Sequence, residues 1–224
     1  SANFRAFLDS LPPDQPFCFW YGANEPHRPY TRDVWKKKGR TEASAKVPAY
    51  LPDVQEVRGD LLDYAYEIEW FDIHLGQIIQ ELEKRDMMQN TIIIVTADNG
   101  LPFPGAKANC YDAGIHVPLA ICWQGHILRH GIEQVAVSLI DIFPTIMELT
   151  GTPYSTIPLS GHSLAPLLGI GKGEYEPHEI YSGRERHSSA RPNNWGYPIR
   201  SMRQGRYLLI RNFHPERMPA GNAL

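Results

Sequence analysis

Two side chains with oxygen donors follow an apolar, β-branched run and are the first candidates for chemistry. Residues 91–95 show no alternation of polar and apolar types, and Asp98 and Asn99 come shortly after them. Such a run is typical of a strand buried on both faces, as in a parallel sheet covered by helices. Open α/β sheets bind ligands at the carboxyl ends of their strands, and Ca²⁺ prefers oxygen ligands. The pattern therefore predicts a cation site at Asp98 and Asn99.

The same residues allow a simpler interpretation, which is a tight hairpin turn. Asn99-Gly100 after a strand is a strong signal for a two-residue turn. Pro102 and Pro104 argue against an immediate return strand, because proline removes a backbone donor. The next strand-like run is residues 117–123, so the connection is long enough to be functional rather than a simple connector.

This connection carries a recognisable pattern. It contains Asp98-Asn99-Gly100, then Lys107, then Tyr111-Asp112-Ala113-Gly114-Ile115-His116-Val117-Pro118-Leu119. The pattern resembles the sulfatase family of the alkaline phosphatase superfamily, which has a metal-binding Asp-(Asn/His)-Gly, a Gly-Lys, a Tyr-Glu-Gly-Gly and a Val-Pro-Leu strand. The chain departs from it at Ala106, which precedes the lysine, and at Asp112-Ala113, which replace Glu-Gly. The spacing from lysine to tyrosine is kept.

The resemblance implies catalytic and metal-binding roles for residues of this chain. Asp98 and Asn99 match two oxygen ligands of the family's Ca²⁺. Lys107 matches the lysine that pairs with the sulfate oxygens, where a point charge is sufficient. His27 matches the histidine that contacts the sulfate ester, where an imidazole can donate a hydrogen bond or act as an acid. Taken alone, His27 is more simply interpreted as a surface histidine and Lys107 as a solvated loop lysine, and only their family order and spacing favour a function.

The C-terminal part of the chain supplies further candidates. In this family it borders the substrate pocket, so Arg184 and His187, with Arg191 after them, are candidates for contacting a sulfated sugar. The arginines at positions 200, 203, 206 and 211 alternate with apolar residues and are interpreted as a solvated face. The expected ligand is a sulfated small molecule or glycan.

The resemblance covers only the second half of a sulfatase. The N-terminal half is expected to hold the Asp-Asp pair of metal ligands and the Cys/Ser-x-Pro-x-Arg segment that becomes formylglycine, and this chain contains neither. Ca²⁺ takes about six to eight oxygens, more than Asp98 and Asn99 provide. The isolated chain is therefore expected to hold Ca²⁺ weakly and to leave sulfate esters intact.

Two other functions remain open at this point. One is a non-catalytic remnant or binding module on a sulfatase scaffold. The other is a phosphodiesterase or phosphatase of the same superfamily, which usually has two metals with further Asp and His ligands. Asp112 and His116 fit that pattern, but they fall within the stretch that matches the sulfatase motif.

Composition excludes several classes of protein. With 42% apolar residues and a formal net charge of −3, the chain has no charge-based reason to bind nucleic acid or an anionic membrane. No apolar segment is long enough to span a bilayer. Three cysteines are too few for a disulfide framework. Cys18 and Cys122 lie in apolar runs and are predicted to be buried, and Cys110 lacks the nucleophile's Cys-x-Pro-x-Arg setting.

Hydrophobic periodicity predicts the elements that must position these residues. A long helix is expected at 58–85, with one buried stripe of Leu61, Ala65, Ile68, Phe71, Leu75, Ile78, Ile79 and Leu82. Shorter helices are predicted at 3–10 and at 142–149, the second with Asp141 as N-cap and Gly151 as stop. Strands are predicted at 16–21, 91–95, 117–123 and 179–182, an extended piece at 133–137, and a hairpin at 199–203 and 206–211.

These elements predict an α/β fold. The family resemblance refines it to a partial alkaline-phosphatase-like α/β/α sandwich with a small C-terminal antiparallel sheet. The expected division is residues 1–170 for the sulfatase domain portion and 171–224 for a C-terminal α+β subdomain. An uncompleted sheet leaves unpaired strand edges, so self-association or a sheet-completing partner is expected. Family habit places such proteins in the periplasm, in the lysosome or outside the cell.

Overall fold

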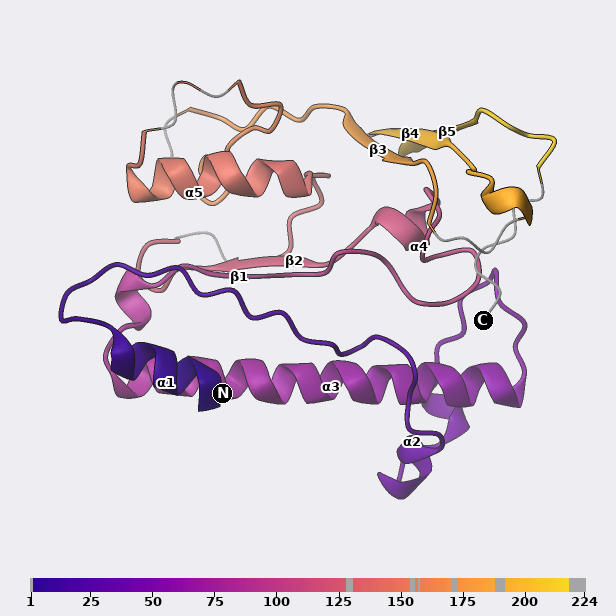
Figure 1. The fold of residues 1–224 in the computed structure, drawn as a ribbon, viewed down its shortest axis with the longest axis horizontal. Coiled ribbons are helices and arrows are strands. Elements are labelled where there is room, and N and C mark those ends of the chain that lie inside the picture. Colours follow the sequence, from indigo (N-terminus) through magenta and orange to yellow (C-terminus); the bar gives the residue numbers. More distant parts are fainter. Residues whose placement is uncertain are drawn as a thin grey trace. The chain divides into compact units, whose positions relative to one another are not determined.

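The computed structural model describes residues 2–127, 131–153, 156, 158–170, 173–187 and 192–217. Their contacts divide the chain into two compact units, Ser1–Met88 and Gln89–Leu224, and each unit is described by itself. The first unit consists of helices and extended segments, and every strand of the described residues belongs to the second (Figure 1).

The first unit is built on the long helix α3, Gln55–Lys84, which confirms the helix predicted at 58–85. The predicted buried stripe is only partly right. Ile78 and Leu82 are buried, whereas Ile68 is 42% exposed. The helix is covered by short segments rather than by a continuous layer within its own unit, so the middle of its apolar face is left open.

Two short elements pack on α3. Helix α1, Ala2–Ser10, confirms the helix predicted at 3–10, and Arg5 pairs with Glu81 of α3 at 2.8 Å. Helix α2, Val34–Lys37, precedes a 3-10 helix at Glu42–Ser44. The buried carboxylate of Asp63 accepts hydrogen bonds from the backbone N–H of Asp33 and Trp35 and so satisfies donors at the start of α2.

The strand predicted at 16–21 does not form. The segment is extended, but it pairs with no described strand, and its side chains alternate between packing on helices and facing solvent. The ring of Phe19 lies 4.8 Å from that of Phe4, and the Tyr21 ring stacks on Phe71 at 6.0 Å. Cys18 is exposed, so the prediction that it is buried is also wrong. Residues 16–21 are therefore held by the packing of their aromatic rings on helices and not by backbone hydrogen bonds to a neighbouring strand.

A 3-10 helix, Met88–Asn90, leads into the second unit, which continues with the two-stranded sheet of β1, Ile93–Thr96, and β2, Leu119–Cys122. The strands are antiparallel, with Ile93 opposite Cys122. Both predicted strands are confirmed, but the parallel, doubly buried setting is not. Residues of β1 are half-buried, and Cys122 lies on the exposed face of β2, contrary to its predicted burial. The apolar run indicates a strand, but it does not show whether the neighbouring strand is parallel or antiparallel.

Helix α5, Ile142–Thr150, follows a 3-10 helix at Leu139–Asp141 and confirms the predicted helix. Gly151 ends it in the left-handed conformation, as predicted, with φ of 65°. Asp141 is the N-cap residue of α5, as predicted, although its side chain makes no capping hydrogen bond to that helix. Ser138 is the N-cap of the preceding 3-10 helix, and Asp141 closes its capping box by accepting the Ser138 N–H at 2.8 Å. No strand forms at 133–137.

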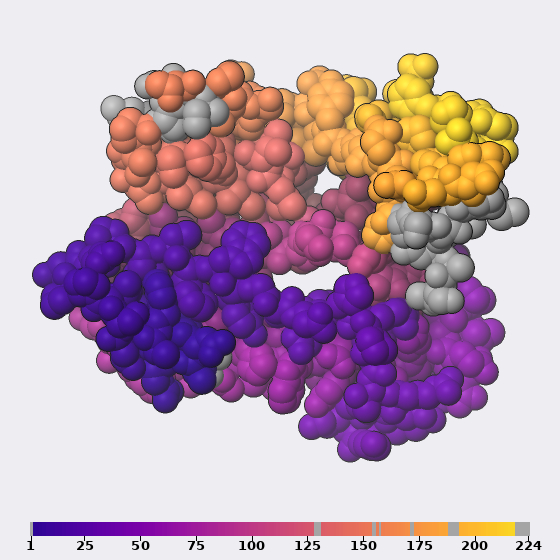
Figure 2. All heavy atoms as spheres, in the orientation of Figure 1, coloured from indigo at the N-terminus to yellow at the C-terminus, as the bar shows by residue number. Residues whose placement is uncertain are grey.

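The C-terminal sheet confirms the predicted strand and hairpin. Strands β3, Ile180–Arg184, β4, Ile199–Gln204, and β5, Tyr207–Asn212, are antiparallel in that order. A 3-10 helix, Pro192–Asn194, precedes β4. Gly205, with φ of 54°, makes the turn between β4 and β5. The atoms of this sheet gather in one orange and yellow region of the second unit (Figure 2).

Candidate functional site

The connection between β1 and β2 is folded back on itself by two glycines. The Gly100 N–H donates to the Gly114 carbonyl at 3.0 Å. A Cβ at Gly100 would lie 1.9 Å from the Ala113 carbonyl oxygen, and a Cβ at Gly114 would lie 2.4 Å from the Ala106 carbonyl oxygen. Only glycine permits this approach, so the motif glycines bring the start, middle and end of the loop together.

Asp98 and Asn99 lie where β1 enters this loop. Asp98 is exposed and Asn99 is half-buried. The Asn99 amide nitrogen donates to the Gly100 carbonyl at 2.8 Å, which fixes the side chain by its donor end. No hydrogen bond to its amide oxygen is found among the described residues. A carboxylate and an amide oxygen are hard donors that fit Ca²⁺, although they are fewer than a full coordination shell.

Lys107 lies at the middle of the same loop. Its backbone N–H donates to the Leu101 carbonyl at 2.9 Å, and its neighbour Ala106 is fully buried. The lysine itself is half-buried. The backbone at Lys107 is therefore held in place, and the ammonium group is carried by a side chain that starts from this fixed position.

Three of the predicted site residues, Lys107, Arg184 and His187, belong to the second unit. Arg184 ends β3 opposite Ile199 of β4, and His187 follows shortly after. Burial lowers the pKa of His187, and the positive charges of Lys107 and Arg184 lower it further. The charges of the β1–β2 loop lysine and of the β3 arginine therefore both act on this imidazole and disfavour its protonated form. Such a cluster of cationic and donor groups suits an anion. Arg191 lies outside the described residues.

Cys110 joins this loop to the C-terminal sheet. It is buried and clusters with Tyr197 and Ile199, with Ile210 packed against them. Burial raises the pKa of the Cys110 thiol, with opposing contributions from Ser201 and from nearby arginines. A buried, protonated thiol is a poor nucleophile. Its side chain packs the β1–β2 loop against Ile199 of β4.

His27 belongs to the first unit, where its surroundings are well defined. It is exposed, and its Nδ1 donates to the Arg28 carbonyl at 2.6 Å, so Nε2 is the ring nitrogen that is not used in this bond. Arg28 makes a two-pronged ion pair with Asp60 of α3 and lies over the Tyr30 ring at 4.5 Å. The helix thus holds the loop that carries His27.

Asp112 and His116, the candidates for a second metal, are already paired. Asp112 forms an ion pair with Arg203 of β4 and lies 3.6 Å from His116. Both side chains are exposed. An arginine takes the position that a metal ion would need, so this pair does not favour a two-metal site.

Sequence reasoning missed a cluster of Asp141, His162 and His178, whose candidate ligand atoms lie within 4.8 Å of one another. The spacing of these three residues matches no metal-binding motif, because they come from separate segments of the sequence. The sequence signal was limited to Gly161-His162, which was noticed only as part of a family-like stretch.

Comparisons with known proteins decide the family. The sequence model of the family described as Sulfatase matches residues 2–152. The chain belongs to the sulfatase family. Human N-sulphoglucosamine sulphohydrolase is 29% identical, with 94% of this chain and 46% of that protein covered. An ulvan-active sulfatase of Formosa agariphila is 26% identical, with coverage of 88% and 31%.

The fold of this sulfatase chain is confirmed by solved structures. A protein of glycosaminoglycan metabolism from Bacteroides thetaiotaomicron matches with a TM-score of 0.75 at 20% identity, over 93% of this chain and 46% of the other. The α/β class of the alkaline phosphatase type, with a small C-terminal antiparallel sheet, is thus correct. The chain spans about half the length of the curated and solved relatives it matches most fully. The division at residue 170 stays a prediction.

The sulfatase family implies two groups, a Ca²⁺ ion and a formylglycine, and the residues of this chain fit only the first. Asp98 and Asn99 offer oxygen donors that suit Ca²⁺. Formylglycine does not fit, because none of the three cysteines and no serine stands in a Cys/Ser-x-Pro-x-Arg segment. Among the described residues, no helix combines the length and apolar character needed to cross a bilayer.

Proposed function

We propose that this sulfatase chain contributes to hydrolysis of sulfate esters of carbohydrates, as the side of the site that holds the cation and the sulfate group. The observation that carries the proposal is that Cys110 packs the β1–β2 loop against the C-terminal sheet, where the charges of Lys107 and Arg184 both act on His187. The names of the relatives support a carbohydrate ligand, since they refer to sulphoglucosamine, ulvan and glycosaminoglycans. We also propose that the protein works outside the cytoplasm, as family habit suggests.

The proposed roles follow from charge and hydrogen bonding. Lys107 pairs with sulfate oxygens as a point charge, and Arg184 offers a fork of N–H donors to an oxygen of the same ligand. Neutral His187 donates one hydrogen bond without adding to the crowding of positive charge. For His27 of the first unit, the family resemblance alone supports a role as a hydrogen-bond donor or acid. Ca²⁺ held by Asp98 and Asn99 supplies further positive charge at the sulfate oxygens.

No step is assigned to a nucleophile of this chain. Cys110 is buried and no formylglycine segment is present, so the chain by itself is proposed to bind sulfate esters without cleaving them. Incubation with 4-nitrophenyl sulfate in Ca²⁺ is the measurement, and no release of nitrophenolate above buffer is the expected result. Turnover that is lost in the Lys107→Gln variant would refute this division of roles.

Binding of a sulfated sugar tests the proposed site directly. Calorimetric titration with glucosamine 6-sulfate is expected to show binding, and glucosamine is expected to show none. Lys107→Gln and Arg184→Gln should each weaken binding about tenfold or more, because each removes a charge-assisted contact. Arg206→Gln, which removes a charge from the hairpin turn of the same sheet, is the matched control and should bind normally.

The outcomes separate the remaining functions. Equal binding of glucosamine 6-sulfate and glucosamine 6-phosphate would favour the phosphatase alternative, against which the Asp112–Arg203 pair already argues. Binding that is unaffected by both Lys107→Gln and Arg184→Gln would contradict the proposed site.

A further inference from the structure

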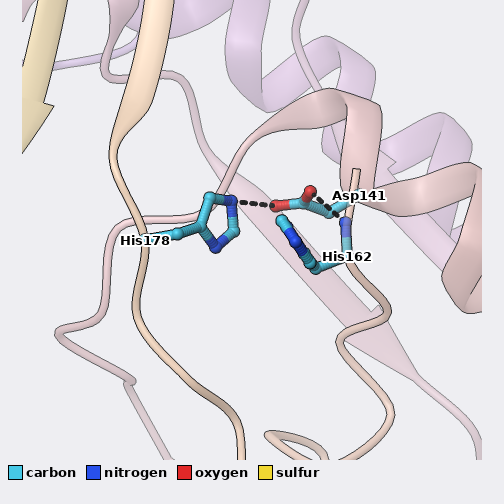
Figure 3. A group of neighbouring side chains, drawn as sticks. All are labelled: Asp141, His162 and His178. Carbon is cyan, nitrogen blue, oxygen red and sulfur yellow. Dashed lines mark hydrogen bonds and ion pairs between the residues drawn. The ribbon is translucent and has the colours of Figure 1, made fainter. Parts of the chain in front are cut away.

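Three side chains from separate segments of the second unit converge around a buried carboxylate. Asp141 ends the 3-10 helix before α5, His162 lies in the loop after α5, and His178 precedes β3. One ligand atom from each lies within 4.8 Å of the other two. Figure 3 shows the His178 ring directed at the carboxylate and the His162 ring beside both.

Asp141 carries a charge in a fully buried position. Its side chain is 0% exposed. Oδ2 accepts the Ser138 N–H at 2.8 Å and Oδ1 accepts the His162 N–H at 2.9 Å. Both partners are neutral backbone donors, and each oxygen keeps a lone pair. No lysine or arginine of the described residues pairs with this carboxylate, although a buried charge is costly unless a cation compensates it.

The two imidazoles are placed to share a cation with that carboxylate. Nε2 of His178 lies 3.9 Å from Asp141 Oδ2, too far for a direct hydrogen bond. Two ligand atoms on a tetrahedral zinc ion with bonds of about 2.0–2.1 Å are separated by roughly 3.3 Å. The His162 and His178 rings lie 4.3 Å apart between centroids, and His162 is exposed and free to turn. A small rotation of the rings closes the remaining gap.

Buried polar atoms without partners surround the cluster. Among the described residues, neither Nδ1 of His178 nor the Tyr175 hydroxyl has a hydrogen-bond partner. The Tyr175 and His178 rings are 6.2 Å apart. Burial raises the pKa of Tyr175 to about 12, and the Asp141 charge contributes to the rise. Unpaired buried polar atoms are rare, so these two indicate a buried water beside the cluster, while Nε2 of His178 faces Asp141.

We propose that Asp141, His162 and His178 bind one divalent transition-metal ion of the zinc class. Two imidazole nitrogens and a carboxylate oxygen suit Zn²⁺, whereas Ca²⁺ prefers oxygens throughout. The three ligands leave a fourth position for water, reached from the exposed His162 side. The ion ties the start of α5, the loop after it and the approach to β3, so its role is to fix the C-terminal sheet on the second unit's own helix.

Cobalt titration of the whole chain tests the proposal, because tetrahedral Co²⁺ bound by nitrogen and oxygen absorbs visible light. One equivalent of Co²⁺ is expected to give this absorption, Zn²⁺ to abolish it, and excess Ca²⁺ to leave it unchanged. His162→Ala and His178→Ala should each weaken Co²⁺ binding at least about tenfold. His126→Ala removes an exposed histidine that stacks on Trp123, and this control should bind Co²⁺ normally.

Thermal unfolding gives a second readout. Zn²⁺ at about a hundredfold excess over its Kd should raise the unfolding temperature by roughly 5–10 °C in the wild type and in His126→Ala, and not in His162→Ala. Because His162 is exposed, its replacement leaves the fold intact. The absence of tetrahedral Co²⁺ absorption would overturn the proposal, as would absorption retained in both ligand variants. A stability that responds to pH but not to Zn²⁺ would instead indicate a plain Asp141–His178 ion pair.

Discussion

Lys107 and His187 lie close enough for the ammonium charge to lower the pKa of the imidazole, although they are held by different elements. The lysine belongs to the β1–β2 loop, and the histidine follows β3. Cys110 makes this possible, because its buried side chain packs the loop against Tyr197 and Ile199. One small buried cluster thus joins the β1–β2 loop to the C-terminal sheet.

Replacing Lys107 tests this proximity. In Lys107→Gln the pKa of His187 should rise toward its ordinary value, because a positive charge that disfavours the imidazolium is removed. Burial and Arg184 remain, so the rise is incomplete. The measurement is an NMR titration of the His187 ring against pH. Lys46→Gln is the control, since it removes an exposed lysine of the first unit. An unchanged His187 pKa in Lys107→Gln would show that the two residues are not neighbours.

Gly100 should tolerate no side chain. A Cβ there would lie 1.9 Å from the Ala113 carbonyl oxygen, so Gly100→Ala must displace backbone. The expected loss is about 1–3 kcal/mol of unfolding free energy, seen as a lower midpoint in urea. Gly76→Ala is the matched control, because nothing lies within 4 Å of its Cβ and α3 continues through it. That variant should gain up to about 1 kcal/mol. Equal stabilities of the two variants would contradict the folded-back loop.

From the open edges of the β1–β2 sheet we predict association between chains. Within the described residues each strand has one neighbour only, so each presents an open edge. Light scattering should show a mass that rises with protein concentration. Ala120→Lys places a charge on the exposed face of β2 and should reduce the association, whereas Ala43→Lys, exposed in the first unit, should not. A single monomeric species up to high concentration would rule the idea out.

Local sequence signals were sufficient for the helices and the hairpin. Helix α3 repeats apolar residues over many turns, and Gly205 marks the turn between β4 and β5, so both are determined by neighbours in the sequence. The antiparallel pairing of β1 with β2 was not predicted, because an apolar run does not indicate whether its partner strand is parallel or antiparallel. Segment 16–21 was mistaken for a strand because aromatic alternation suits packing on helices equally well.

The candidate site was likewise predictable from the sequence only in part. The motif around Asp98 and Lys107 is local and could be read directly, and Arg184 and His187 were named from their place in the family. Their proximity to Lys107 depends on the packing of Cys110, which no local pattern reveals. The cluster of Asp141, His162 and His178 was missed because its members meet only through the tertiary fold. Asp141 was noticed as a helix start, and the carboxylate that closes the Ser138 capping box also faces the histidines.

The pKa of His187 in the presence of a sulfated sugar tests the central claim most directly. An anion held by Lys107, Arg184 and His187 favours the charged imidazole, so saturating glucosamine 6-sulfate should raise the pKa of His187, and affinity should grow as pH falls toward that pKa. Glucosamine should leave the His187 titration unchanged. A His187 pKa that is the same with and without the sulfated sugar would show that this cluster does not hold sulfate.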